Sequence, residues 1–166
     1  MNTFKPIQVC FVCLGNICRS PLAQGVFETL VEREGLSDKI HTRSAGTGNW
    51  HVGKLPDPRM MNTARNKGVA LKSRARQFVS GDFDRFDLVL AMDKSNLIAL
   101  ESLCPDAAVE EKLRLFRSFD PASHGDLEVP DPYYGGINGF EHVFDIVDRT
   151  CPKILEYLKT RYSLTP

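Results

Sequence analysis

The sequence predicts a single-domain α/β fold in which helices cover both faces of a parallel sheet. Strand-like and helix-like segments alternate along the chain, which is typical of parallel sheets. The 166 residues amount to about one average domain, and neither an internal repeat nor a Ser/Gly-rich linker divides them. A chain of this size can bury enough surface to fold without disulfides or a structural metal. One domain over residues 1–166 is therefore expected.

The first strand and the first helix have the clearest signals. Residues 7–12 are a short apolar run rich in β-branched side chains, as expected of a buried strand. Ser20 and Pro21 have the residue types of a helix N-cap and first helical position. Gly35 ends the helix that follows. Its apolar residues lie on one face: Leu22, Val26, Phe27, Leu30 and Val31.

Three more strands and two short helices are expected in the middle of the chain. Residues 40–45 form the second predicted strand, and residues 58–67 form a helix. Residues 86–92 are a nearly continuous apolar run, typical of a strand covered on both faces. A further helix is predicted over residues 93–103, and residues 113–116 are the fourth predicted strand.

A turn-rich stretch over residues 120–139 precedes the last predicted helix. The apolar face of that helix has seven members: Val143, Phe144, Val147, Cys151, Ile154, Leu155 and Leu158. Pro152 falls within the pattern, and since proline lacks an N–H it is expected to kink or divide the helix. Parallel α/β sheets bind ligands beyond the carboxyl ends of their strands, so residues 13–20 are the expected site.

Composition argues against several classes of protein. With 42% apolar and 25% charged residues, the chain has the composition of an ordinary globular protein. Its 21 basic residues balance 21 acidic ones, which argues against nucleic-acid binding. No apolar run approaches a membrane span, and the N-terminus does not resemble a signal peptide, so we expect a cytoplasmic protein without membrane insertion. Three of the five cysteines fall within residues 10–18, which favours reduced thiols with a chemical role.

The segment from Cys13 to Ser20 has the residue types of phosphate chemistry. A loop between a strand and a helix N-terminus directs successive N–H groups into one concavity that suits an anion. Gly15 and Asn16 tolerate the positive φ that such a curve requires. Cys13 at the start of the loop is expected to be ionised and to attack a phosphoryl group, and Arg19 offers a planar fork of donors to phosphate oxygens.

The sequence CLGNICRSPLA, which begins at Cys13, resembles the signature of the low-molecular-weight protein tyrosine phosphatases. The resemblance continues through RSAGTGNWHVG at 43–53, ARQF at 75–78, FDLVLAMDKSN at 86–96 and VPDPYYGG at 129–136, and the tail is more similar to bacterial members. It implies a four-stranded parallel sheet with the phosphate-binding loop between the first strand and the first helix. It also implies hydrolysis of protein phosphotyrosine and aryl phosphate monoesters through a cysteinyl-phosphate, without metal or cofactor.

The resemblance assigns a role to each site residue. Cys13 is the nucleophile, Arg19 the phosphate clamp, and Asp131 the general acid that protonates the leaving phenolate and then activates water. Asn16 is expected to hold the shape of the loop through Ser44. The other residues of the phosphate-binding loop are Leu14, Gly15, Ile17, Cys18 and Ser20, whose hydroxyl is expected beside the thiolate.

The resemblance also implies a substrate pocket and a redox partner. Trp50 and Tyr133 resemble the family's aromatic walls around the substrate ring, and Tyr134 is assigned to the same pocket. Cys18 is expected to be a resolving thiol that traps the oxidised nucleophile as a disulfide; alternatively, it is a small residue packed under the loop. Ser73 occupies the position where the family often has a His that supports the loop.

Three rival functions share parts of this pattern. Thioredoxin-coupled arsenate reductases need relay cysteines, and residues 70–103 contain none. Protein arginine phosphatases have Thr in place of Ile17, and the branched apolar side chain is expected to favour a flat aryl ester. A non-catalytic phosphate or phosphopeptide binder would keep the loop, yet nothing that catalysis needs is missing from it. A phosphotyrosine-containing protein is therefore the expected partner, and the balanced composition favours a monomer.

Metal and nucleotide signals are weak. Residues 48–54 begin like a nucleotide-binding loop, but Leu55 stands where Ser or Thr must bind Mg²⁺. Cys10 and Cys13 have the spacing of a zinc half-site without a second pair. The four histidines are interpreted as surface or structural residues: His41, His51, His124 and His142.

Overall fold

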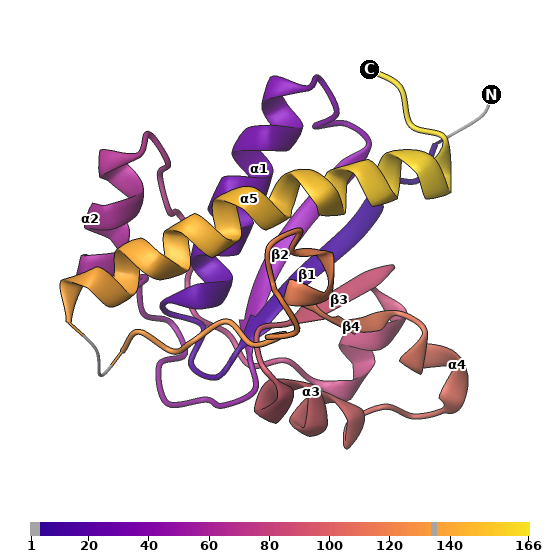
Figure 1. The fold of residues 1–166 in the computed structure, drawn as a ribbon. Helices are drawn as coiled ribbons and strands as arrows, with labels where there is room; N and C mark the ends of the chain where they lie inside the picture. Colours follow the sequence, from indigo (N-terminus) through magenta and orange to yellow (C-terminus); the bar gives the residue numbers. More distant parts are fainter. Residues whose placement is uncertain (1–3, 134–135) are drawn as a thin grey trace.

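Four parallel strands form the centre of the molecule, which a computed structural model describes over residues 4–133 and 136–166 (Figure 1). In sheet order they are β2 (Ile40–Gly46), β1 (Ile7–Cys13), β3 (Leu88–Ala91) and β4 (Leu113–Leu115). Every neighbouring pair is parallel, with Cys13 opposite Gly46 and Val12 opposite Ala91. The predicted four-stranded parallel sheet is therefore confirmed.

Helices cover both faces of this sheet, as the alternating pattern predicts. In Figure 1, α5 runs across α1 on one side of the strands, while α3 lies on the other side. Among the described residues, the α-helices are α1 (Arg19–Arg33), α2 (Pro58–Asn66), α3 (Lys94–Glu101), α4 (Ala107–Glu110) and α5 (Ile137–Tyr162). The same residues contain the 3₁₀ turns η1 (Ser80–Asp84) and η2 (Phe116–Phe119). No helix in the described part of the chain is long and apolar enough to span a membrane.

The alternation of side chains along β1 divides the core into two parts. Phe11 points into the larger part, where its ring packs edge-on against Phe27 of α1 at 5.6 Å and Phe116 of η2 at 6.0 Å. Cys10 points into the smaller part on the opposite face of the sheet. Cys13 faces the same side as Phe11, because residues two apart on a strand share a face.

The expectation that Pro152 kinks or divides the last helix is wrong with respect to division, since α5 is continuous over residues 137–162. Pro152 and Asp148 both lie on the exposed face of α5. Because proline has no N–H, the Asp148 carbonyl has no donor within the helix. Water can satisfy that carbonyl at the surface, so the helix continues through the proline.

The carboxyl ends of three strands lie together at one end of the sheet. β1 ends at Cys13, β2 at Gly46 and β3 at Ala91. Residues 76–78 are hydrogen-bonded to the end of β2. The Gly46 N–H donates to the Arg76 carbonyl, and the Gly46 carbonyl accepts from the Phe78 N–H, each at 2.8 Å. The residues predicted to carry chemistry follow these strand ends.

Candidate active site

The loop between β1 and α1 turns its carbonyl groups outward. The Cys13 carbonyl accepts from the Thr47 N–H, and the Leu14 carbonyl from the Gly48 N–H, each at 2.9 Å. None of the N–H groups of residues 14–18 donates to an acceptor within the described residues. They are therefore available to an anion inside the curve, at the N-terminus of α1.

Asn16 holds this curve by hydrogen bonds at both ends of its side chain. It has φ 56° and is 1% exposed. Its amide nitrogen donates to Ser20 Oγ at 2.8 Å, and its amide oxygen accepts from the Arg76 N–H at 3.0 Å. The expected support through Ser44 is wrong, because these two partners occupy the Asn16 amide and the buried Ser44 Oγ has no hydrogen-bond partner among the described residues.

Cys13 lies at the end of β1 with its sulfur 2.9 Å from Ser20 Oγ. Since Ser20 already accepts from Asn16, its single proton is free for the sulfur or for the Ala45 carbonyl, which lies farther away at 3.4 Å. Ser20 is not the N-cap that the sequence predicts. Cys18 occupies the N-cap position without a side-chain hydrogen bond, because the Ser20 hydroxyl lies within the first turn and bonds to the loop. A sulfur anion at Cys13 thus has a hydroxyl donor beside it.

Arg19 is fixed under the loop by acceptors from two other segments. The side chain, only 3% exposed, donates through Nη1 to Asp93 Oδ2 at 2.6 Å and to the Val129 carbonyl at 3.0 Å. Its Nη2 lies 3.6 Å from Asp131 Oδ2. Burial alone would lower the pKa of Arg19, but Cys13, Asp93 and Asp131 together outweigh it and raise the pKa. The guanidinium is therefore charged, rigid and next to the sulfur-bearing loop.

Asp93 is a site residue that the sequence analysis missed. The segment from Asp93 to Asn96 indicated only the start of a helix, and Asp93 is indeed the N-cap of α3, accepting from the Asn96 N–H at 2.7 Å. The same carboxylate also holds Arg19. Asp93 lies two residues after the end of β3, at the carboxyl ends of the strands where ligands bind, and this is the signal that could have identified it.

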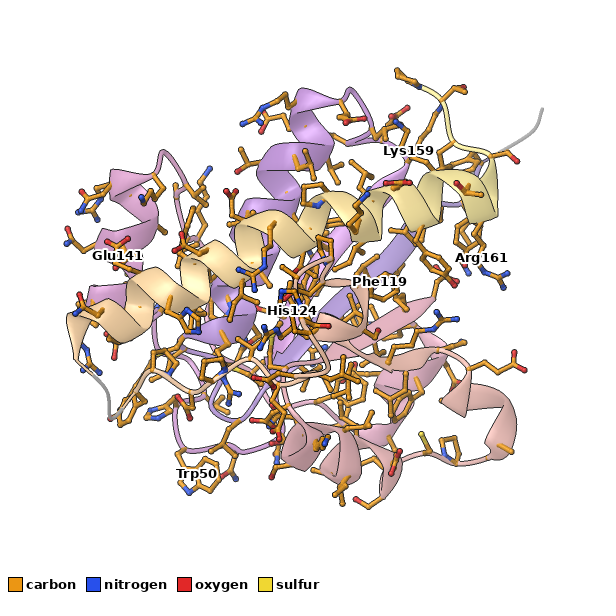
Figure 2. All side chains as sticks on the ribbon, in the orientation of Figure 1. Trp50, Phe119, His124, Glu141, Lys159 and Arg161 are labelled. Carbon is orange, nitrogen blue, oxygen red and sulfur yellow. The ribbon has the colours of Figure 1, made fainter. Side chains whose placement is uncertain are left out.

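The loop forms the floor of a pocket of about 350 Å³. Trp50, His51, Asp131 and Tyr133 form its walls. Three of these residues were predicted for the site, namely Trp50, Asp131 and Tyr133, and they share one pocket with Cys13 and Arg19. Figure 2 shows Trp50 projecting outward at the edge of the molecule, where it is 66% exposed. Tyr134 lies outside the described residues.

His51 lines this pocket, although the sequence analysis interpreted all four histidines as surface or structural residues. Its ring lies 6.2 Å from that of Tyr133, across the mouth of the pocket. A hypothetical Cβ on Gly15 would come within 2.9 Å of the His51 ring, so glycine allows the loop and the wall to approach closely. The RSAGTGNWHVG resemblance covers His51, but no spacing in the sequence singles it out.

The segment with Asp131 is held mainly by a hydrogen bond within its own turn. Asp131 Oδ1 accepts from the Tyr133 N–H at 3.0 Å, while the Asp131 side chain is 36% exposed. Arg59 donates to the Tyr133 carbonyl at 3.1 Å and lies over the Tyr133 ring at 5.6 Å. Arg59 is in turn fixed by Asp57, and its hydrogen bonds lower the pKa of Asp57. The segment with Asp131 thus rests on a surface arginine.

The two cysteines nearest Cys13 in the sequence lie in different environments. Cys18 lines the same pocket as Cys13, and burial, aided by the nearby Asp57, raises the pKa of its thiol. Cys10 points to the opposite face of β1, where burial also raises the pKa of its thiol. Cys10 and Cys13 therefore cannot bind one metal together, and only Cys18 shares the pocket.

A loop with a cysteine at its start and an arginine at its end, beyond the strands of a parallel sheet, is the arrangement expected of a cysteine-dependent phosphatase of the α/β class. The family model described as low molecular weight phosphotyrosine protein phosphatase matches residues 8–164. The low molecular weight protein-tyrosine-phosphatase of Streptomyces coelicolor is 48% identical over 149 residues, which cover 89% of this chain and 91% of that protein. The chain belongs to this family, which confirms the resemblance in its sequence.

Solved structures agree with this assignment. A protein tyrosine phosphatase of Entamoeba histolytica, crystallised with Hepes in the active site, is 37% identical with a TM-score of 0.89 over 94% of this chain and 99% of that one. A Drosophila arginine phosphatase is 33% identical with a TM-score of 0.84, over 92% and 98% of the two chains. The chain is therefore a phosphatase, and its preferred phosphate ester depends on details of the pocket.

Proposed function

We propose that the chain hydrolyses phosphotyrosine in proteins through a cysteinyl-phosphate on Cys13. The observation that carries this proposal is one pocket that contains the Cys13 sulfur, the Arg19 guanidinium and the Asp131 carboxyl group. These are the nucleophile, the anion clamp and the proton donor that phosphoryl transfer from an aryl ester needs.

In the first step, the phosphoryl group binds the N–H groups of residues 14–18 and the Arg19 guanidinium. The sulfur anion of Cys13 attacks phosphorus, the bond from phosphorus to the phenolic oxygen breaks, and the leaving oxygen keeps the electron pair. Asp131 in its protonated form donates its proton to that oxygen. The position of Asp131 at the mouth, 3.6 Å from the guanidinium, supports this role because the leaving group faces outward.

In the second step, Asp131 accepts a proton from a water molecule whose oxygen attacks the phosphorus of the cysteinyl-phosphate. The bond from sulfur to phosphorus breaks, the electron pair returns to sulfur, and phosphate leaves. Ser20 donates its proton toward the departing sulfur, as the 2.9 Å distance between sulfur and oxygen supports. The neighbouring Asn16 keeps the Ser20 oxygen in place by donating to it.

The walls of the pocket favour an aryl ester. Trp50 and Tyr133 line it, and both are partly exposed, as residues that contact a planar ring at the mouth must be. Ile17 adds a branched apolar side chain to the lining. A phosphorylated guanidinium group is wider and polar at its edges, so burying it against Ile17 would leave polar groups unpaired.

We further infer that the protein acts as a monomer in the cytoplasm, on phosphoprotein partners and without nucleic acid. The balance of 21 basic and 21 acidic residues supports the absence of a nucleic-acid partner. All five cysteines of the chain are free thiols, which suits a reducing compartment. Sedimentation of the purified chain tests the monomer.

The function is tested with two peptides of one sequence, one phosphorylated on Tyr and the other on Arg. Release of phosphate should be faster from the phosphotyrosine peptide and unchanged by EDTA. Faster release from the phosphoarginine peptide would replace the proposed substrate, and loss of activity in EDTA would contradict metal-free catalysis by the cysteine.

A further inference from the structure

A second pocket lies beside the first turns of α1, outside the site described above. It measures about 290 Å³ and lies between α1, β2 and residues 72–76. We call it the α1–β2 pocket. Its lining includes Gln24 and Glu28 of α1, Arg43 and Ser44 of β2, and Lys72, Arg74 and Arg76 of the loop.

Unpaired polar atoms gather in the wall of this pocket. Four buried side-chain nitrogen or oxygen atoms have no hydrogen-bond partner in the described part of the chain, and three of them belong to residues of this wall. They are Gln24 Oε1, Ser44 Oγ and Arg76 Nη2. Ser44 is only 4% exposed. Because buried polar groups are nearly always paired, three unpaired ones in one wall indicate a missing partner.

The same wall carries an excess of positive charge. Arg43, Lys72 and Arg74 form no ion pair with a described carboxylate. Arg76 pairs with Asp82 through Nη1 at 3.1 Å, which leaves its Nη2 unused. The missing partner is therefore an anion.

Glu28 is the acidic residue of the wall, and its carboxylate is already engaged. Its Oε1 accepts from Gln24 Nε2 at 2.9 Å and from Thr42 Oγ1 at 2.6 Å. Because Gln24 Nε2 donates to Glu28, Gln24 Oε1 is the amide atom that remains without a hydrogen-bond donor. An occupant must therefore accept from Arg76 and Ser44 and also donate one proton to Gln24.

We propose that the α1–β2 pocket binds a free hydrogen phosphate ion. Its unprotonated oxygens accept from Arg76 Nη2, from Ser44 Oγ and from the exposed cations, while its one hydroxyl donates to Gln24 Oε1. A phosphate monoester is largely dianionic at neutral pH and has no such proton, so the Gln24 acceptor favours the free ion over a phosphorylated side chain. The three unpaired atoms are shielded from solvent, so a side chain of the wall must move to admit the ion.

The pocket adjoins the support of the catalytic loop. The N–H of Arg76 donates to the Asn16 amide oxygen at 3.0 Å, and Ser44 precedes Ala45, whose carbonyl lies 3.4 Å from Ser20 Oγ. Free phosphate is a product of the proposed hydrolysis, so the ion would be present wherever the enzyme works. Binding here is nonetheless independent of catalysis, and it can be measured in an inactive protein.

The test is a phosphate titration of protein whose Cys13 has been carboxymethylated, which places a covalent carboxylate in the catalytic loop. Amide signals of residues 24, 44 and 72–76 should shift and saturate. Lys72→Gln should weaken binding at least threefold, whereas Lys5→Gln, a matched change at an exposed lysine outside the pocket, should leave it unchanged. Shifts that do not saturate, or that respond equally to both lysine variants, would overturn the proposal.

Two further arms identify the occupant. Sulfate has no proton at neutral pH, so it should bind more weakly than phosphate to the wild-type chain, and Gln24→Met should abolish the difference. O-phosphoserine should also bind more weakly than free phosphate. Equal binding of sulfate and phosphate by the wild type would overturn the role of Gln24, and tighter binding of O-phosphoserine would overturn the choice of the free ion.

Discussion

Two of the segments that line the candidate catalytic pocket, the phosphate-binding loop and the turn with Asp131, differ in how firmly the rest of the chain holds them. In the phosphate-binding loop, Asn16, Cys18, Arg19 and Ser20 are each at most 4% exposed. Their partners come from the ends of β2 and β3 and from residues 76 and 129. By contrast, Asp131 has a side chain that is 36% exposed, and its main hydrogen bond comes from Tyr133 in the same turn.

The difference suits the roles that we propose for the two segments. Charge develops on the phosphoryl oxygens in the transition state, so their donors work best when they are fixed in advance. A general acid must instead meet a leaving group and then a water molecule at the mouth of the pocket. Gly46 illustrates the tightness of the first segment, because a Cβ there would lie 2.8 Å from the Leu14 carbonyl oxygen.

The largest effect is expected from Cys13→Ser, which removes the proposed nucleophile and leaves the fixed donors in place. Activity on phosphotyrosine peptide should fall below detection, because a neutral serine hydroxyl without an adjacent base is a poor nucleophile. Vanadate should still bind, since the N–H groups and Arg19 are unchanged. Residual turnover above a tenth of wild type would disprove the assignment of Cys13.

A smaller loss is expected from Asp131→Ala in the exposed segment. The rate constant kcat should fall by about 10²- to 10⁴-fold for phosphotyrosine, whose phenolate needs a proton to leave. The loss on p-nitrophenyl phosphate should be smaller because its phenolate leaves more readily. Equal losses on the two substrates, measured side by side, would show that Asp131 is not the acid.

The same contrast explains which parts of the site could be predicted from the sequence. Cys13, Gly15 and Arg19 could be predicted because a loop between a strand and a helix N-terminus is determined locally. Asp131 could not, since Asp followed by Pro is also a common turn, and only the matching DPYY context gave it a role.

Partners distant in sequence were predicted less well. Asp93, which is 74 residues from Arg19, was missed, and the support of Asn16 was assigned to Ser44 and not to the backbone of Arg76. The four strands were predicted well because buried apolar runs depend little on their partners. The N-cap of α1 was predicted wrongly because the Ser20 hydroxyl has another partner in the loop.

Asp93→Asn tests whether the rigidity of the loop matters for catalysis. The change keeps the size and the cap geometry of the side chain but weakens its hold on Arg19, so kcat should fall by about 10- to 100-fold. Inhibition by phosphate should weaken in parallel, because the same guanidinium binds the product. Unchanged phosphate inhibition, or a loss of thermal stability large enough to explain the rate, would contradict a positioning role.

Cys18→Ala tests whether the cysteine packed in the rigid loop protects its neighbour. After inactivation by peroxide and treatment with dithiothreitol, wild type should recover most of its activity and Cys18→Ala little, since an unprotected sulfenic acid oxidises further. Cys104→Ala, outside the pocket, is the control and should recover like wild type. Equal recovery in all three proteins would leave Cys18 with a packing role alone.

The smallest effect is expected from Ile17→Thr, which changes the side chain that the rigid loop presents to the substrate. Ile17 is half-buried and lines the pocket, so we expect it to contact the ester next to the phosphoryl group. Thr is smaller and offers a hydroxyl, which can pair with an N–H of a phosphorylated guanidinium. The ratio of kcat/KM for phosphoarginine over phosphotyrosine should therefore rise several-fold, because one restored hydrogen bond is worth about 1 kcal/mol.

Leu14→Thr is the matched control for this change. It makes a comparable replacement in the same loop, at a side chain that is 43% exposed, and should leave the ratio unchanged. If both variants shift the ratio equally, any polar residue in the loop has the effect, and Ile17 has no special position. If neither shifts it, the tightly held loop supplies only phosphate binding, and the choice of ester depends on the more exposed walls near Trp50 and Tyr133.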